Sequence, residues 1–251
     1  MMKIRTTLLL SAVALATFST NAFATQKKGT KTNRNTKARI ETGMRTITED
    51  AARAHVYFLA DDLLEGRRAG ERGSRIAKRY IESRIREIGL KPLLGDSYEQ
   101  PFEACGVQRL KRSPRFYVNA DSIAKIKKGV YQSLALSNVL AMLPGRKSDE
   151  YVVVGAHLDH EGQYADVAGD GIYNGADDNA SGVSAVLQIM KAFAASGEQP
   201  ERTVVFAFWD GEEYGLLGSQ YFTDHFSGMA KVKGYLNFDM IGRNNKPDNP
   251  P

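Results

Sequence analysis

Hydrophobic and polar positions alternate between two periods in the second half of the chain. Short apolar runs, rich in branched residues and typical of strands buried on both faces, are separated by segments with apolar residues at helical spacing. The predicted strands cover residues 138–143, 151–156, 203–208 and 233–238, and the predicted helices cover residues 183–197 and 215–226. Strands that alternate with helices predict an α/β fold, with a mostly parallel (mixed) central sheet and helices on both faces.

The first half of the chain has a less regular pattern. Residues 47–64 have apolar positions at helical spacing, and a glycine-punctuated turn follows at residues 65–70. A second helix is predicted to begin with Ser74 as its N-cap and to stop at Gly89. Residues 91–134 are irregular, and a small lid or an edge hairpin is predicted there.

The N-terminus has the features of a secretory signal. Lys3 and Arg5 precede an apolar run at residues 8–16, and Ala22 and Ala24 are small residues of the kind that signal peptidase requires. Cleavage after Ala24 is predicted, with a periplasmic or secreted location and no stable membrane insertion afterwards. A membrane anchor ranks second, because the run is too short to cross a bilayer comfortably.

The positive charge of the chain is concentrated near its start. The net charge is +5, but residues 1–45 hold nine Lys or Arg and one acid, a charge of +8, which leaves −3 for the remainder. The basic residues have no interleaved aromatic platform, so nucleic-acid binding is not expected. The predicted organisation is a signal peptide (1–24), a disordered basic linker (25–45), an N-terminal helical segment with an irregular insert (46–136) and a catalytic α/β domain (137–251).

The single cysteine, Cys105, excludes an internal disulfide. The hydrophobic core must therefore stabilise the fold, and Cys105 is interpreted as a small apolar core residue rather than a nucleophile. The 251 residues are enough for one α/β domain with a covering segment, or for two small domains.

A histidine and several carboxylates follow the predicted strands. His157 and Asp159 come after the strand at 151–156, residues 210–213 (Asp-Gly-Glu-Glu) come after the next strand, and Asp239 comes after the last one. Asp178 lies just before a predicted helix. Because ligands gather beyond the carboxyl ends of the strands in an open α/β sheet, these segments are predicted to meet at one edge.

Imidazole and carboxylate ligands without a thiolate suit a catalytic zinc ion, and a carboxylate can bridge two ions. Asp159 is predicted to accept a proton from the second imidazole nitrogen of His157, since residues two apart in an extended chain share one side. Glu212 and Glu213 are adjacent, so one could bind metal while the other acts as general base. The residues alone do not decide which.

Simpler interpretations exist for the individual residues. Asp177, Asn179 and Ser181 could each cap the following helix, and at least one is expected to do so. The spacing of Asp166 and Asp170 does not match an EF-hand loop. The chain contains no GxSxG and no HExxH motif, which argues against serine-hydrolase and thermolysin-like chemistry.

The ordered set of segments resembles the co-catalytic di-zinc aminopeptidase family, which includes bacterial leucyl aminopeptidases, glutamate carboxypeptidases and the transferrin-receptor ectodomain. The resemblance covers roughly residues 51–243. It is most specific in four segments: 156–159, 175–182, 211–219 and 237–240. The segment 63–67 (Leu-Leu-Glu-Gly-Arg) also resembles bacterial members.

This resemblance implies a role for each candidate residue. The carboxylate of Asp178 would bridge two zinc ions, and the peptide bond from Asp178 to Asn179 would be cis. His157 and Asp239 would complete the first zinc site, and Glu213 would join Asp178 at the second. Glu212 would be the general base, and Asp159 would orient the histidine. Peptides would be the substrates.

The family supplies a further histidine from a segment well downstream of Asp239, and this sequence does not contain that segment. None of the other histidines is expected to substitute: His160 would face away from His157, His55 belongs to the N-terminal helix, and His225 ends a helix that leads away from the site. The chain is therefore predicted to lack the C-terminal part of the fold and one zinc ligand.

The function predicted is an exported zinc exopeptidase of the aminopeptidase type. The alternatives are a non-catalytic homologue with the same fold and a single-zinc transferase of the glutaminyl-cyclase type.

Overall fold

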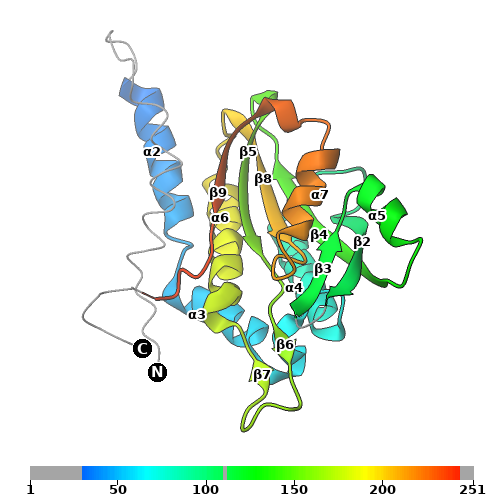
Figure 1. Cartoon of the computed structure of the whole chain (residues 1–251). Helices are drawn as coiled ribbons and strands as arrows, with labels where there is room; N and C mark the ends of the chain where they lie inside the picture. Colours follow the sequence, from blue (N-terminus) through cyan, green and yellow to red (C-terminus); the bar gives the residue numbers. More distant parts are fainter. Residues whose placement is uncertain (1–29, 110–111, 244–251) are drawn as a thin grey trace.

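The structure is a computed structural model that describes residues 30–109 and 112–243. The predicted signal peptide at residues 1–24 lies outside the described residues. Figure 1 shows one curved sheet with helices on both of its faces. Within the described part of the chain, no helix combines the length and the apolarity that crossing a membrane requires.

The elements follow one another with short connections. The helices are α2 (Thr30–Met44), α3 (Glu49–Leu59), α4 (Arg72–Ile88), α5 (Ala120–Ile126), α6 (Gly182–Ser196) and α7 (Leu217–His225), with short helical turns η2 (Asp62–Arg67), η3 (Ala176–Ser181) and η4 (Met229–Lys231). The strands are β1 (Lys91–Pro92), β2 (Glu99–Arg109), β3 (Arg112–Tyr117), β4 (Gln132–Leu143), β5 (Lys147–His157), β6 (Gly162–Gln163), β7 (Ile172–Tyr173), β8 (Arg202–Trp209) and β9 (Val232–Asn237).

The main sheet is mixed, as predicted, but most of its strand pairings are antiparallel, so the expectation of a mostly parallel sheet is wrong. Its order is β3-β2-β4-β8-β5-β9, and β1 pairs with β4. The parallel pairings are those of β5 with β8 and with β9, and the remaining pairings are antiparallel. The antiparallel part comes largely from residues 91–143. A strand was predicted at 138–143, but the long paired strand β2, its partner β3 and the start of β4 lie within residues 91–134, where the sequence indicated only a lid or an edge hairpin.

Both faces of the sheet are covered, which explains the uninterrupted apolar runs of its strands. In β8, Val204, Phe206 and Phe208 belong to the core that includes residues of α4 and α6. Val205, Ala207 and Trp209 point to the opposite face, where Phe222 of α7 packs. A strand that buries alternate side chains on two faces must be apolar at almost every position.

Three boundaries differ from the predictions. Residues 30–44 form helix α2 rather than a disordered linker, and Gly43 allows its backbone to approach Ala192 of α6 closely. Helix α4 begins at Arg72, so Ser74 lies inside its first turn and is not the N-cap. The boundary between residues 136 and 137 falls within β4, which joins both parts of the chain in one sheet.

A partly buried histidine of α3, which faces α4, should make stability depend on pH. His55 Nδ1 lies 2.8 Å from the hydroxyl of Tyr80. Burial, helped by the positive charges of Arg84 and Lys191, lowers the pKa of His55 to about 4. As the pH falls, His55 therefore becomes protonated in the unfolded chain before it does in the folded one. The free energy of unfolding is expected to decrease by up to about 3 kcal/mol between pH 6.5 and 4.

Urea unfolding across this pH range tests the prediction. The variant His55→Gln should lose less free energy of unfolding than the wild type between pH 6.5 and 4, while the exposed His225→Gln should behave as the wild type. Equal pH slopes for all three proteins would contradict it.

Candidate metal centre

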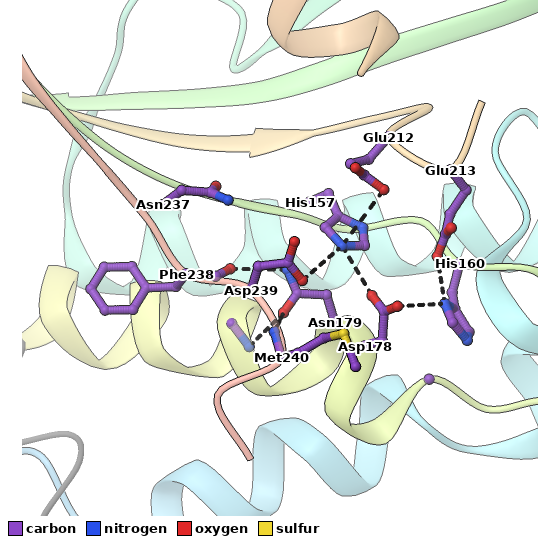
Figure 2. A network of polar contacts seen from close by, with 12 residues as sticks. His157, His160, Asp178, Asn179, Glu212, Glu213, Asn237, Phe238, Asp239 and Met240 are labelled. Carbon is purple, nitrogen blue, oxygen red and sulfur yellow. Dashed lines mark hydrogen bonds and ion pairs between the residues drawn. The ribbon is translucent and has the colours of Figure 1, made fainter. Parts of the chain in front are cut away.

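The central parallel strands bring the predicted site residues to one edge. His157 is the last residue of β5, while Glu212 and Glu213 follow β8 and Asp239 follows β9. Asp178 lies in η3, immediately before α6. Because β8 and β9 flank β5 in parallel, their carboxyl ends meet beside His157 (Figure 2). All of the predicted site residues therefore lie close together.

The first cluster is built around the ring of His157. Its Nε2 lies 3.1 Å from Asp178 Oδ1 and 3.4 Å from Asp239 Oδ1. These separations match the edge of about 3.4 Å expected between ligand atoms that surround a tetrahedral zinc ion at about 2.0–2.2 Å. Asp178 Oδ1 is buried and has no aligned hydrogen-bond donor among the described residues. The three atoms thus fit a cation in the space between them.

The environment of the His157 ring also favours a positive charge between this ring and the carboxylates. Its Nδ1 lies 3.1 Å from the carbonyl oxygen of Asp159, which can only accept, so Nδ1 carries a proton and Nε2 is left facing the carboxylates. Burial by itself lowers the pKa of His157. The carboxylates of Asp178, Asp159, Glu212 and Asp239 outweigh this effect and raise the pKa to about 9. The site therefore favours positive charge at this ring.

Asp178 faces two clusters at once. Its Oδ1 points to His157 and its Oδ2 lies 3.9 Å from His160 Nδ1. The peptide bond from Asp178 to Asn179 is cis, as the family resemblance implies. Asn179 Oδ1 accepts a hydrogen bond of 3.0 Å from the amide of Gly182, the first residue of α6. Of the three candidate caps Asp177, Asn179 and Ser181, Asn179 is thus the one that accepts from this first amide of α6.

The expectation that His160 would face away from His157 is wrong. His160 Nδ1 lies 2.7 Å from Glu213 Oε1, and these two residues form a second possible metal-binding group with Asp178. The alternation of an extended strand ends at His157, where β5 ends. Beyond it the chain turns, and the amide of His160 donates to the carbonyl of Arg67. This turn directs the ring towards the site.

Asp159 contacts the site differently from the prediction. Its carboxylate lies 3.9 Å from His157 Nδ1, and it is the Asp159 carbonyl that contacts the ring. The carboxylate instead accepts from the amides of Glu212 and Glu213, at 3.1 and 3.3 Å. Burial and the neighbouring Asp210 carboxylate raise the pKa of Asp159. Asp159 therefore positions the segment that carries both glutamates.

Glu212 and Glu213 point to different parts of the site. Glu213 contacts His160, whereas Glu212 Oε2 lies 4.0 Å from His157 Nε2 and makes no hydrogen bond within the described chain. Burial raises the pKa of Glu212. The trio His157, Glu212 and Glu213 is also close enough to hold an ion. The geometry favours Glu213 as a ligand, because it belongs to both groups in which a glutamate occurs.

Two buried cations were missed by the sequence analysis. The guanidinium of Arg67 donates to the carbonyls of Leu59, Leu158, Asn174 and Gly175, so it joins the segments before Asp178 and after His157. Lys78 Nζ lies 2.8 Å from Asp210 Oδ2 and anchors the start of the 210–213 segment. The family resemblance of the Leu-Leu-Glu-Gly-Arg segment was the one sequence feature that could have drawn attention to Arg67. No sequence feature pointed to Lys78.

Comparison with known proteins finds similarity to peptidases. The model of peptidase family M28 matches residues 138–249. Leupeptin-inactivating enzyme 1 of Streptomyces exfoliatus is 39% identical over 110 residues, which are 43% of this chain and 23% of that protein. Leucine aminopeptidase 1 of Trichophyton rubrum is 39% identical over 115 residues, 44% of this chain and 30% of that protein. The chain thus spans less than a third of either curated relative.

The fold is shared with solved structures. The aminopeptidase from Aneurinibacillus sp. strain AM-1 has a TM-score of 0.56 at 15% sequence identity, and the match covers 80% of this chain and 72% of that one. At this identity the likeness shows a common fold. It agrees with the mixed sheet and two helical layers described above.

Proposed function

We propose, from the premise that residues 138–249 match the model of peptidase family M28, that this protein is a zinc-dependent aminopeptidase that removes N-terminal residues from peptides. The observation that carries the proposal is the convergence of Asp178 and Asp239 on His157 Nε2, within 3.4 Å. The similarity to a leucine aminopeptidase and the fold shared with an aminopeptidase support it.

The residues present fit zinc. His157, Asp178 and Asp239 would hold the ion, and their neutral imidazole and carboxylate donors are those of catalytic zinc sites. When bound, zinc lowers the pKa of a coordinated water to about 7 and polarises a carbonyl. Glu212 takes the proton from the attacking water and gives it to the leaving amine, and its raised pKa suits it to both transfers.

We further propose that the protein acts outside the cytoplasm, in the periplasm or as a secreted enzyme. The basic and apolar segments that precede Ala24 support export. Peptides would be its partners in either location.

Release of the chromophore from leucine p-nitroanilide tests the activity. The purified protein should cleave this substrate, lose the activity in a metal chelator and regain it with zinc, while the N-acetylated substrate should stay intact. Activity that survives chelation would contradict the proposal. Formation of pyroglutamate from a peptide with N-terminal glutamine would identify a transferase instead, and zinc binding without any turnover would identify a non-catalytic homologue.

The contact of Asp159 with two amides gives a further prediction. Asp159→Asn keeps one acceptor oxygen but places an amide donor against the other N–H group, so it should misplace Glu212. We expect kcat to fall about 10–100-fold, with KM changed little. Asp149→Asn is the control, because Asp149 lies at the start of β5, is exposed and pairs, among the described residues, with Lys231 alone. Equal kcat for the two variants would contradict the role assigned to Asp159.

A further inference from the structure

His160 occupies a position that neither the family resemblance nor the sequence assigns to a metal ligand. Its side chain is only 12% exposed, and its Nδ1 faces the carboxylates of Glu213 and Asp178 at 2.7 and 3.9 Å. Figure 2 shows the ring on the far side of Asp178 from His157. One aspartate therefore separates two imidazoles, each of which turns a nitrogen towards it.

The surroundings of His160 hold the ring in this orientation. Gly175 has a φ of 61°, and a Cβ built on it would lie 2.6 Å from His160 Cδ2. Any side chain at residue 175 would thus push the ring out of place. On the other side, the amide of His160 donates to the carbonyl of Arg67, and Arg67 also donates to the carbonyl of Gly175. Gly175 and Arg67, which lie on the two sides of the ring, are thus hydrogen-bonded to each other.

We propose that His160 Nδ1 is a ligand of a second metal ion, together with Asp178 Oδ2 and Glu213. The inference rests on the metal site of the proposed function and extends it. The two distances from Nδ1 bracket the edge of about 3.4 Å between the ligand atoms of tetrahedral zinc. Asp178 then contributes one oxygen to each ion. Both ions are held by residues of this chain between His157 and Asp239.

A ligand must be distinguished from a residue that merely hydrogen-bonds to Glu213. Loss of such a partner can also weaken metal binding about 10–100-fold, so affinity alone does not decide. A replacement that brings a new donor atom does. In His160→Cys the thiolate sulfur is a new donor on the same Cβ, and its longer bond to a metal, about 2.3 Å against about 2.0–2.1 Å for nitrogen, makes up part of its shorter reach.

The experiment is titration of the folded protein with Co²⁺, followed by absorption and by metal analysis after gel filtration. The wild type should bind two ions per chain, and His160→Ala should bind one. His160→Cys should bind two and gain the near-ultraviolet band of thiolate-to-Co²⁺ charge transfer. His225→Cys is the matched control: its position is exposed, and no such band is expected. Cys105 is present in every protein and is buried.

The outcomes separate this inference from the proposed function. A wild type that binds one ion would overturn the inference and leave the first site intact, whereas no binding at all would remove both. A folded His160→Cys protein that binds two ions without the charge-transfer band would show that residue 160 is not a ligand. If both variants fail to fold, X-ray absorption of the zinc-loaded wild type decides, since His160 ligation gives one imidazole per zinc on average and its absence gives half that number.

Discussion

Replacement of Glu212 by Gln is expected to lower kcat for peptide hydrolysis by about 10²–10⁴-fold while zinc binding is unchanged. The carboxylate of Glu212 approaches the site with its oxygen 4.0 Å from His157 Nε2, and burial raises its pKa, so it can accept a proton and return it. The amide of glutamine has nearly the same shape and hydrogen-bonds as well, but it cannot accept the proton.

Two measurements on Glu212→Gln test this role: kcat with leucine p-nitroanilide, and zinc content after dialysis. Glu161→Gln, an exposed acid near the site, is the control and should retain wild-type values. A fall in kcat of less than about threefold would exclude Glu212 as the base. Loss of zinc together with activity would instead make it a ligand, in line with its place in the trio of His157, Glu212 and Glu213.

Replacement of Arg67 by Met should lower the free energy of unfolding by about 3–5 kcal/mol, because several buried carbonyls would lose their donors at about 1–3 kcal/mol each. The side chain is 1% exposed and donates to four carbonyls. Burial lowers the pKa of Arg67 to about 10, and Asp159, Asp178 and Glu213 oppose this effect. Arg67 therefore remains charged at neutral pH. Arg67→Lys should restore only part of the stability, since an ammonium group cannot span the same fork.

Urea denaturation of the metal-free proteins measures this effect without any contribution from zinc. Arg75→Met is the matched control, because Arg75 is exposed and donates to one carbonyl, that of Gly70. The control should lose less than about 1 kcal/mol. A similarly small loss in Arg67→Met would show that the fold does not depend on these hydrogen bonds.

The convergence of the site could be predicted because it follows from the order of the elements. Once 151–156, 203–208 and 233–238 are taken as parallel strands, the residues after them must lie at one edge, whatever the details of packing. The same argument could not orient His160 or the carboxylate of Asp159. Both lie beyond the end of β5, where the alternation of side chains no longer holds and local hydrogen bonds decide the conformation.

The N-terminal elements were hidden for other reasons. Helix α2 is rich in Lys, Thr and Asn, a composition that also suits a disordered segment, and its place against α6 depends on the small residue Gly43. Buried and exposed side chains alternate less regularly along β2 than along a half-buried strand. The strand lies between β3 and β4, and parts of both of its faces are covered. Arg67 was missed because the Leu-Leu-Glu-Gly-Arg segment indicates a family resemblance, and nothing in it reveals that the arginine is buried and bonded to carbonyls.

The most direct test of the account is the anomalous diffraction of a zinc-loaded crystal. A zinc peak should lie about 2.0–2.2 Å from His157 Nε2 and from one carboxylate oxygen each of Asp178 and Asp239. A crystal soaked in saturating zinc that shows these three side chains in place and no peak between them would contradict the account.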